Sequence, residues 1–409
     1  MSSTGLASAL APFRVRSFRF QWPADLLTSW AFEMETLILG WYVLSETGSV
    51  LLLTVFGSLQ FLGTLIAPMF GVVADRLGRR AMLLAMRTTY VSLAAVLMAL
   101  GLSDLLTPYQ VLALAFGMGL VRPSDLVMRN ALIGDTVPVD WLAKAIGLSR
   151  MTMDSARIAG ALVGAGLFSF LGIGPAYIVV TAFYLVSLGL TLGVAGLDPG
   201  DAEQPAEDAT SPWRELTQGL AFVRHTPEVL ALMCLAFLVN LTAFPVTFGL
   251  LPYVAREIYA IDQIGLGHLV AGFAGGALLG SLAMTLTGGA RHPGRLMLLS
   301  MIAWYGLVFL FGQQAGKLPG FAVLLAIGVV QSIAMISMSV TLLRITPERY
   351  RGRVMGVRML AVYGLPLGLL AGGVAIDGFG FGATMIAYSL IGVFFVALLG
   401  IRWRDVIWR

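Results

Sequence analysis

Cysteine and histidine are nearly absent from this chain, whose 409 residues include one cysteine, Cys234, and three histidines. A single cysteine excludes an intramolecular disulfide and any metal cage built of cysteines. The sequence also shows no Cys–His cluster of the kind that metalloenzymes use and no glycine loop that would bind the phosphates of a nucleotide. We therefore expect no metal, no cofactor and no enzymatic activity.

Charge is scarce as well: charged residues make up 12% of the chain and hydrophobic residues 58%. Apolar runs long enough to cross a bilayer recur along the whole length, and none alternates in the way a membrane β-barrel requires. The composition predicts an all-α integral membrane protein. Twelve spans are predicted, near residues 22–44, 50–73, 82–102, 108–131, 142–170, 175–196, 229–253, 265–287, 295–314, 320–343, 354–376 and 381–401.

The basic residues predict the orientation of these spans. If the chain crosses the membrane twelve times, the loops on one side contain few basic residues beyond Arg256 and Lys317. The termini and loops on the other side contain Arg14, Arg16, Arg19, Arg76, Arg79, Arg80, Arg291, Arg295, Arg349, Arg351, Arg353, Arg402, Arg404 and Arg409. Because the positive side is cytoplasmic, both termini are expected there. The net charge of +4 is explained by these juxtamembrane arginines and does not indicate nucleic-acid binding. Residues 1–21 lack a small-residue cleavage site, so no removable signal peptide is expected.

A polar, acidic and proline-containing segment, residues 197–212, interrupts the apolar pattern between the sixth and seventh spans. Such a segment cannot bury a core, and it predicts a linker. It is followed by apolar residues at helical spacing over residues 213–226, which predict an amphipathic helix on the cytoplasmic face with Trp213 as interface anchor. The expected organisation is an N-terminal six-helix bundle (1–196), a cytoplasmic linker with this helix (197–227) and a C-terminal six-helix bundle (228–409).

The two halves also repeat in sequence. Pro138, Trp141, Ala143, Lys144 and Gly147 follow the fourth span, and Pro347, Tyr350, Gly352, Arg353 and Gly356 follow the tenth span with the same spacing. Internal repeats of this kind underlie many transporter folds. The pattern indicates a duplicated bundle.

The loop after the second span, Gly71-Val-Val-Ala-Asp75-Arg76-Leu-Gly78-Arg79-Arg80, places charge and glycine between two apolar runs. It resembles the motif between helices 2 and 3 of the major facilitator superfamily. Further stretches resemble the branch that holds the enterobactin exporter and macrolide efflux pumps: Trp41-Tyr-Val, Thr47-Gly48-Ser49, Asn130–Pro138, Ala156–Gly160 and Pro347–Gly356.

This resemblance implies two pseudo-symmetric six-helix bundles and a secondary transporter of the inner membrane. Members of the branch export amphipathic organic molecules at the expense of a proton gradient, so the implied partners are a small-molecule substrate, protons and the lipid bilayer, and a monomer is expected. One departure keeps an importer or symporter as the alternative: exporters of this kind usually have Gly-Pro in span 5, whereas Gly160 is followed here by Ala161. A channel or a receptor without transport is the second alternative.

Acidic residues inside span 1 are the first candidates for function, because a charge at mid-bilayer costs about 2.5–3.5 kcal/mol and faces a cavity or a partner. Glu33 lies near the middle of the span, and the resemblance implies that it lines the path and takes up protons. Glu35 is turned from it by about 200° and cannot point into the same cavity. Either Glu35 pairs with a neighbouring helix, or both acids lie in a water-filled vestibule.

Spans 4 and 5 carry a second set of charges in mirrored order: Arg122, Asp125 and Arg129, then Arg150, Asp154 and Arg157. If the two helices form an antiparallel hairpin, Asp125 and Asp154 are each expected to reach arginines on the facing helix. This ladder is either a structural staple, or it places Arg122 or Arg157 as an anion contact for the substrate or as a partner that releases Glu33 or Asp154 on protonation.

The candidate site residues fall into three groups. The expected proton-coupling residues are Glu33, Asp154, Asp125 and Glu35. The expected lining of the substrate cavity comprises Asp25, Glu33, Gln60, Arg122, Arg157, Asn240, Gln331 and Tyr363. The resemblance implies a conformational latch made of Gly71, Asp75, Arg76, Gly78, Arg79, Arg80, Arg353 and Gly356, with the carboxylate of Asp75 at the positive start of the eleventh span.

Overall fold

The computed structural model describes residues 10–64, 66–195, 212–287 and 291–404, and these residues form helices joined by short turns, with no strand among them. The chain divides into two compact units. One comprises residues 1–39 and 60–209, and the other comprises residues 40–59 and 210–409. The long first helix, α2 (Arg16–Thr47), therefore contributes its first part to one unit and its end to the other.

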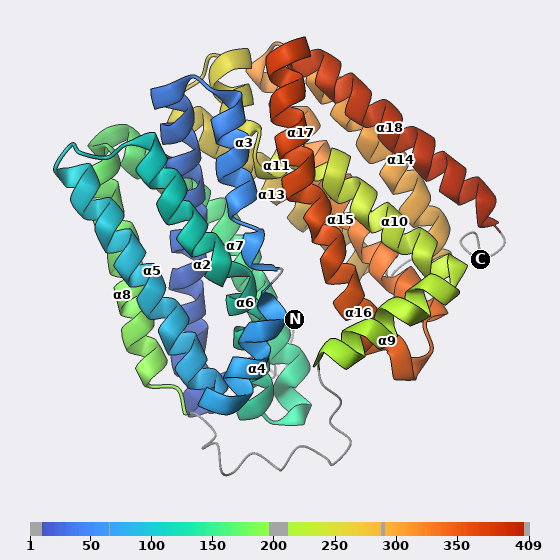
Figure 1. Cartoon of the computed structure of the whole chain (residues 1–409), viewed down its shortest axis with the longest axis horizontal. Coiled ribbons are helices and arrows are strands. Elements are labelled where there is room, and N and C mark those ends of the chain that lie inside the picture. The colour runs from blue at the N-terminus through green and yellow to red at the C-terminus, as the bar shows by residue number, and fades with distance from the viewer. Residues whose placement is uncertain (1–9, 65, 196–211, 288–290, 405–409) are drawn as a thin grey trace. The chain divides into compact units, whose positions relative to one another are not determined.

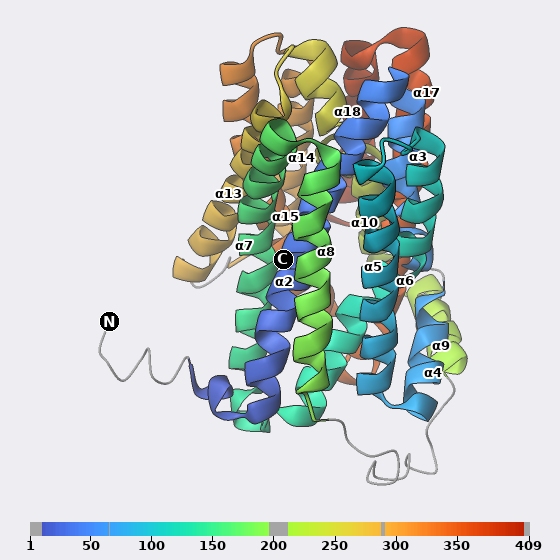
Figure 2. The ribbon, with the colours of Figure 1, turned by 90° about the vertical axis from the view of Figure 1, so that its left-hand side faces the viewer.

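The first unit is built around α2. Its other elements are η1 (Ala11–Arg14), η2 (Leu62–Thr64), α4 (Ala67–Leu77), α5 (Arg79–Leu102), α6 (Pro108–Thr136), α7 (Val139–Leu171) and α8 (Ile173–Leu192). Helices α5 and α8 lie side by side (Figure 2). They cross closely at Gly101 and Gly174, where a Cβ on Gly174 would lie 2.8 Å from the carbonyl oxygen of Gly101. Small residues permit such backbone approach between membrane helices, where apolar burial gives little driving force.

The second unit holds the remaining helices (Figure 1). They are α3 (Val50–Leu59), α9 (Pro212–His225), α10 (Pro227–Thr242), α11 (Phe244–Phe248), α12 (Leu251–Tyr253), the π-helix η3 (Val254–Ile258), α13 (Gln263–Leu286), α14 (Pro293–Gly312), α15 (Lys317–Ile345), η4 (Glu348–Tyr350), α16 (Arg351–Leu360), η5 (Ala361–Tyr363), α17 (Gly364–Phe379) and α18 (Phe381–Arg402). Helix α3 packs on α17, where the hydroxyl of Ser58 donates to the carbonyl of Pro366 at 3.1 Å.

Each of the twelve predicted spans coincides with a helix or with a series of short helices. In the part of the chain that the structure describes, nine helices are long and apolar enough to cross a membrane, or ten if α9 and α10 are counted as one span bent by 109°. The first span, α2, carries several charges. The second and seventh spans are broken, at η2 and at the α11–α12–η3 segment respectively.

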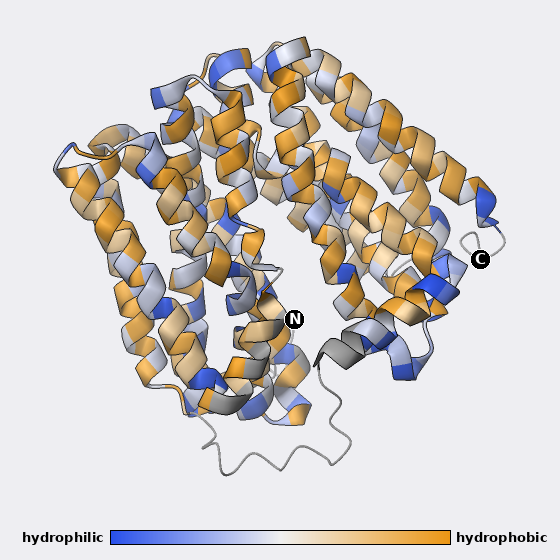
Figure 3. Cartoon of the chain, viewed as in Figure 1, coloured by the Kyte–Doolittle hydropathy of each residue, from blue (hydrophilic) through white to orange (hydrophobic). Residues whose placement is uncertain are grey.

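Most residues of the helices are hydrophobic (Figure 3). Many of their large apolar side chains are exposed. Phe170, Leu286 and Phe379 are each more than three-quarters exposed. An apolar surface of this extent is costly in water but matches the hydrocarbon of a bilayer.

The predicted amphipathic helix over residues 213–226 is present as α9 (Pro212–His225). Residues 197–211 of the predicted linker lie outside the described residues. The bend of 109° between α9 and α10 separates α9 from the span that follows it, as expected of a helix at the membrane surface.

The sequence repeat has a structural counterpart. Pro138 precedes α7 and Pro347 precedes η4, with backbone angles φ −54°, ψ 144° and φ −55°, ψ 145°. Three residues later, the amides of Trp141 and Tyr350 each donate to the carbonyl of that proline at 2.9 Å. The same turn thus starts the helix after the fourth span and the segment after the tenth.

Candidate functional site

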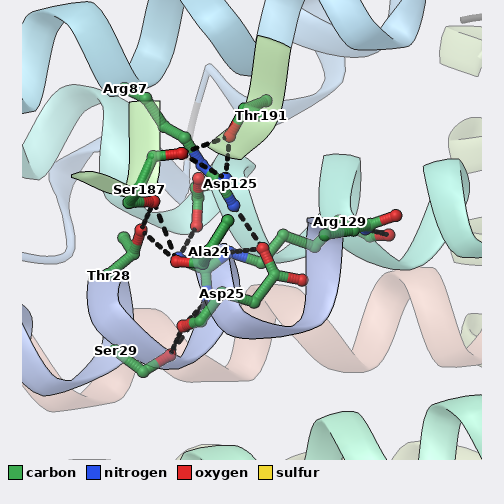
Figure 4. Close-up of polar contacts among 10 residues, drawn as sticks. Ala24, Asp25, Thr28, Ser29, Arg87, Asp125, Arg129, Ser187 and Thr191 are labelled. Atoms are coloured by element: carbon green, nitrogen blue, oxygen red, sulfur yellow. Dashed lines mark hydrogen bonds and ion pairs between the residues drawn. The ribbon is translucent and has the colours of Figure 1, made fainter. Parts of the chain in front are cut away.

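A buried cluster of four charged side chains links α2, α5 and α6 (Figure 4). Asp25 pairs with Arg87 and lies 3.5 Å from Nε of Arg129, and Arg129 Nη2 lies 2.5 Å from Oδ2 of Asp125. All four residues are at most 4% exposed. Two carboxylates and two guanidinium groups sum to zero formal charge, so the cluster is a closed set of mutually paired ions.

Hydroxyl groups extend this cluster to α8. Arg87 donates to the hydroxyl of Thr191 and, at 3.4 Å, to the carbonyl of Ser187, whose hydroxyl lies 2.6 Å from that of Thr28. The hydroxyl of Ser29 accepts from Arg129 at 3.0 Å. The network therefore joins four helices of the first unit, and its burial fits a structural role rather than substrate contact.

Glu35 faces α8 as well, at tyrosines that lie nearer the start of that helix than Ser187 and Thr191 do. It is 4% exposed and accepts hydrogen bonds from the hydroxyls of Tyr177 at 3.1 Å and Tyr184 at 3.0 Å. Tyr184 also packs against Phe32 and Tyr90. Glu35 is thus held by a neighbouring helix, which was one of the two alternatives left open by its position.

Glu33 faces α7 and has a different environment. Its Oε1 lies 3.7 Å from Nε of Arg157, and the two side chains are 25% and 30% exposed. The distance is too long for a hydrogen bond, so the pair is loose. Gly160, one turn along α7, lies against α2: a Cβ there would be 2.9 Å from Cβ of Glu33 and 3.1 Å from the carbonyl of Trp30.

Arg122 of α6 contacts α2 at Phe32 and Thr36, on either side of Glu33 in the sequence. Its guanidinium donates to Thr36 at 3.0 Å and to Oε1 of Gln60, and it stacks over the ring of Phe32 with 4.3 Å to the centroid. Gln60 follows α3 directly, where the second span breaks. Arg122 thus connects α6 to α2 and to this break.

The mirrored ladder between spans 4 and 5 is not what the structure contains. Asp125 pairs with Arg129 on its own helix, and Asp154 lies 3.8 Å from Arg150, also on its own helix. The prediction assumed that α6 and α7 face each other along their length. Instead α7 turns its glycine face toward α2, where a Cβ on Gly164 would lie 2.8 Å from Cα of Met34.

The candidate residues of the second unit lie on three different elements: Asn240 on α10, Gln331 on α15 and Tyr363 on η5. Asn240 donates to the carbonyl of Ala236 on its own helix at 2.8 Å, Gln331 is 7% exposed within α15, and Tyr363 ends η5. Cavity lining by these three residues stays a prediction.

The proposed latch is described in part. The side chains of Gly71, Asp75 and Arg76 lie outside the described ones. Gly78 adopts φ +86° between α4 and α5, a conformation that favours glycine. Two arginines after it reach the ends of other helices: Arg79 pairs with Asp135 near the end of α6, and Arg80 donates to the carbonyl of Leu192 at 2.7 Å. In the second half, Arg353 lies over the ring of Tyr350, and Gly356 follows on α16.

Arg87 was not among the predicted site residues, although an arginine within a predicted span is a signal, because a charge buried in the bilayer is costly without a partner. Tyr177 and Tyr184, which donate to Glu35, were not predicted either. No pattern in the sequence distinguishes these tyrosines from others that pack in apolar spans.

Comparison with solved structures identifies the fold of the protein. The fold resembles those of the nucleoside transporter NupG, with a TM-score of 0.73 and 14% identity over 95% of this chain and 99% of that chain, and of the POT family transporter PepTSo, with a TM-score of 0.72 and 14% identity over 96% and 98%. The protein therefore shares the fold of these two membrane transporters.

The sequence narrows this assignment. Residues 7–404 match the family model described as transmembrane secretion effector, and the chain belongs to that family of the major facilitator superfamily. The enterobactin exporter EntS of Shigella boydii is 25% identical over 311 residues, which are 74% of this chain and 70% of that protein. The predicted superfamily and fold class are thereby confirmed.

Proposed function

We propose that the protein is a proton-coupled exporter of amphipathic small organic molecules. Two bundles, residues 1–196 and 228–409, would rock about a site near the middle of the bilayer, so that the site opens to each side in turn. The proposal places the transporter in a bacterial inner membrane as a monomer with both termini in the cytoplasm. Its support comes from one ion pair, from the family and from the relative named above.

The observation that carries the proposal is the loose pair between Glu33 and Arg157. Both side chains are partly exposed and separated by 3.7 Å, whereas Asp25, Asp125 and Glu35 are at most 4% exposed. A proton that reaches Glu33 removes the carboxylate charge that faces Arg157, and so changes how strongly this part of the protein attracts a charged group of the substrate. A cationic group of the substrate held by the ionised Glu33 would be displaced by the proton, which is the coupling an exporting antiporter needs. An anionic group attracted by Arg157 would instead bind together with the proton, as in a symporter.

The export direction is supported by the family description and by the similarity to an enterobactin exporter. An importer or symporter remains the second candidate because Ala161 follows Gly160, where exporters of this kind usually have proline. The direction of proton movement relative to substrate movement distinguishes these two candidates. A channel or receptor would show no fixed ratio of protons to substrate.

The test is proton movement in proteoliposomes that contain the wild type or Glu33→Gln, challenged with siderophores, macrolides and cationic dyes under an imposed pH gradient. Coupled flux is expected to be abolished in Glu33→Gln, because glutamine cannot exchange a proton. Glu46→Gln is the matched control: Glu46 lies on the same helix but is exposed, and its variant should transport like the wild type. Glu35→Gln is expected to retain coupling, since the amide oxygen can still accept from one tyrosine while the amide nitrogen donates to the hydroxyl of the other.

Two results would contradict this assignment. Normal coupled flux in Glu33→Gln together with loss in Glu35→Gln would transfer the proton site to the buried acid. Substrate flux without any proton movement in the wild type would remove proton coupling altogether, while leaving the transporter class intact.

The latch gives a separate prediction. We propose, from the position of Asp75 in the motif, that its carboxylate lies at the N-terminus of the eleventh span and stabilises the conformation that is closed on the cytoplasmic side. A carboxylate at a helix N-terminus contributes about 0.3–1 kcal/mol. Asp75→Asn is therefore expected to slow transport about two- to fivefold with unchanged expression, measured as initial flux in proteoliposomes. Asp140→Asn, which removes an exposed carboxylate from the first turn of α7, serves as the control, and equal rates in the two variants would refute the latch.

A further inference from the structure

An apolar groove lies in the second unit where α9, α10, α16 and α18 meet. It has a volume of about 480 Å³ and is lined by aliphatic and aromatic side chains together with the only cysteine of the chain. The lining includes Leu220 of α9, Cys234 and Phe237 of α10, Val357 of α16 and Leu399 of α18. The groove plays no part in the transport mechanism proposed above.

Helix α9 forms one wall of this groove. Helix α9 lies across the start of α10 and along α16 (Figure 1). It contacts α16 at Gly219, where a Cβ would lie 3.0 Å from the carbonyl of Arg353. It contacts η4 at Phe222, whose ring stacks on Tyr350 with centroids 4.3 Å apart. Because these contacts hold α9 on one side, Leu220 remains 52% exposed on the other, toward the groove.

The open walls of the groove face the place that lipid occupies around a membrane-spanning unit. Leu230, Phe237 and Phe395 line it and are 39%, 37% and 43% exposed. A groove that is open on the outside of a spanning helix bundle and offers no polar lining is filled by hydrocarbon rather than by water.

Two arginines lie one helical turn beyond the lining. Arg224 is four residues after Leu220 on α9, and Arg402 is three residues after Leu399 on α18, so each shares a helix face with a lining residue. Both arginines are exposed. Glu228, at the start of α10, is turned by about 200° from the lining residue Leu230 and does not face the groove. The mouth is therefore cationic.

We propose that this groove binds one acyl chain of an anionic phospholipid, with the phosphate of the headgroup held by Arg224 and Arg402. The apolar walls account for the chain, the arginines account for the charge of the headgroup, and the position at the ends of α9 and α18 places the two parts at the depths they have in a leaflet. Bound there, the lipid connects α9 to α10, α16 and α18. The proposal does not depend on the substrate or on proton coupling.

Cys234 supplies the readout. The full-length protein is reconstituted in nanodiscs of phosphatidylcholine alone or with an added fraction of phosphatidylglycerol, and alkylation of the single thiol by N-ethylmaleimide is followed by mass spectrometry. Any acyl chain in the groove covers the thiol, but a chain whose anionic headgroup both arginines hold leaves the groove less often than a chain of phosphatidylcholine. Phosphatidylglycerol is therefore expected to slow alkylation about tenfold in a saturable way. The Arg224→Gln and Arg402→Gln double variant should need about thirtyfold more phosphatidylglycerol for the same protection.

Arg344→Gln is the matched control, because Arg344 is an exposed arginine in the last turn of α15 that does not line the groove. It should be protected like the wild type. Native mass spectrometry gives an independent count: the wild type should retain one phosphatidylglycerol that the double variant loses. Equal alkylation rates in the two lipid mixtures, equal protection of the double variant, or protection that follows protein concentration instead of lipid composition would each overturn the proposal.

Discussion

Replacing Asp25 with asparagine is expected to destabilise the first unit by about 3–5 kcal/mol, the cost of leaving a buried charge without its partner. Asp25 pairs with Arg87 and also faces Arg129. Without its carboxylate, the cluster keeps two guanidinium groups and one carboxylate in a region that is almost fully buried. Neither arginine can be deprotonated to relieve this excess charge.

The thermal unfolding midpoint of the purified protein in detergent, followed by tryptophan fluorescence, measures this effect. Asp154→Asn is the matched control: it removes the same charge from the same unit, but from a pair whose side chains are 37% and 73% exposed. A pair of that kind contributes at most about 1 kcal/mol. Similar midpoints for the two variants would show that the buried cluster is not a determinant of stability.

A compensating variant separates charge balance from shape. Asp25→Leu combined with Arg87→Leu removes one ion of each sign and leaves Arg129 paired with Asp125. Because replacing both members of a buried pair is often close to neutral, the double variant should recover most of the stability that Asp25→Leu loses alone. If the double variant is no more stable than the single one, the hydrogen bonds of Arg87 to α8 matter more than its charge.

The spans were predictable because a bilayer requires runs of apolar residues, and such runs are visible without knowledge of their neighbours. The breaks in the second and seventh spans were not visible in the same way. At the first of these breaks, Gly63 lies close to the carbonyls of Gly119 and Leu120 on α6. That contact joins residues far apart in sequence, and hydropathy carries no information about it.

In the candidate site, too, some features were predictable from the sequence and others were not. Helical spacing alone predicted that Glu33 and Glu35 do not both point into one cavity, but it left open what each one contacts. In the structure Glu33 faces Arg157, and Glu35 accepts from two tyrosines of α8. The ladder prediction failed because equal depth along two helices does not determine which faces meet. Only the packing of Gly160 and Gly164 on α2 decides which way α7 turns its charges.

The close packing of α7 on α2 at Gly164 predicts a second variant with a large loss of stability and transport. Gly164→Val is expected to cost about 1–3 kcal/mol or more, because its Cβ would lie 2.8 Å from Cα of Met34, and backbone cannot move aside as a flexible side chain can. The added atoms would push α7 away from α2 and widen the distance between Arg157 and Glu33, so coupled flux should fall along with the unfolding midpoint.

Gly166 allows the matched comparison. It lies two residues further along α7, and a Cβ there would meet nothing within 4 Å. Gly166→Val changes the same atoms on the same helix, so any general effect of valine on helix propensity is shared by both variants and amounts to a few tenths of a kcal/mol. A large loss of stability and flux in Gly164→Val with near wild-type behaviour in Gly166→Val would establish that close approach of α7 to α2 positions Arg157 beside Glu33. Equal losses would instead assign the effect to the helix itself, and the ion pair would then have to be positioned by the side chains alone.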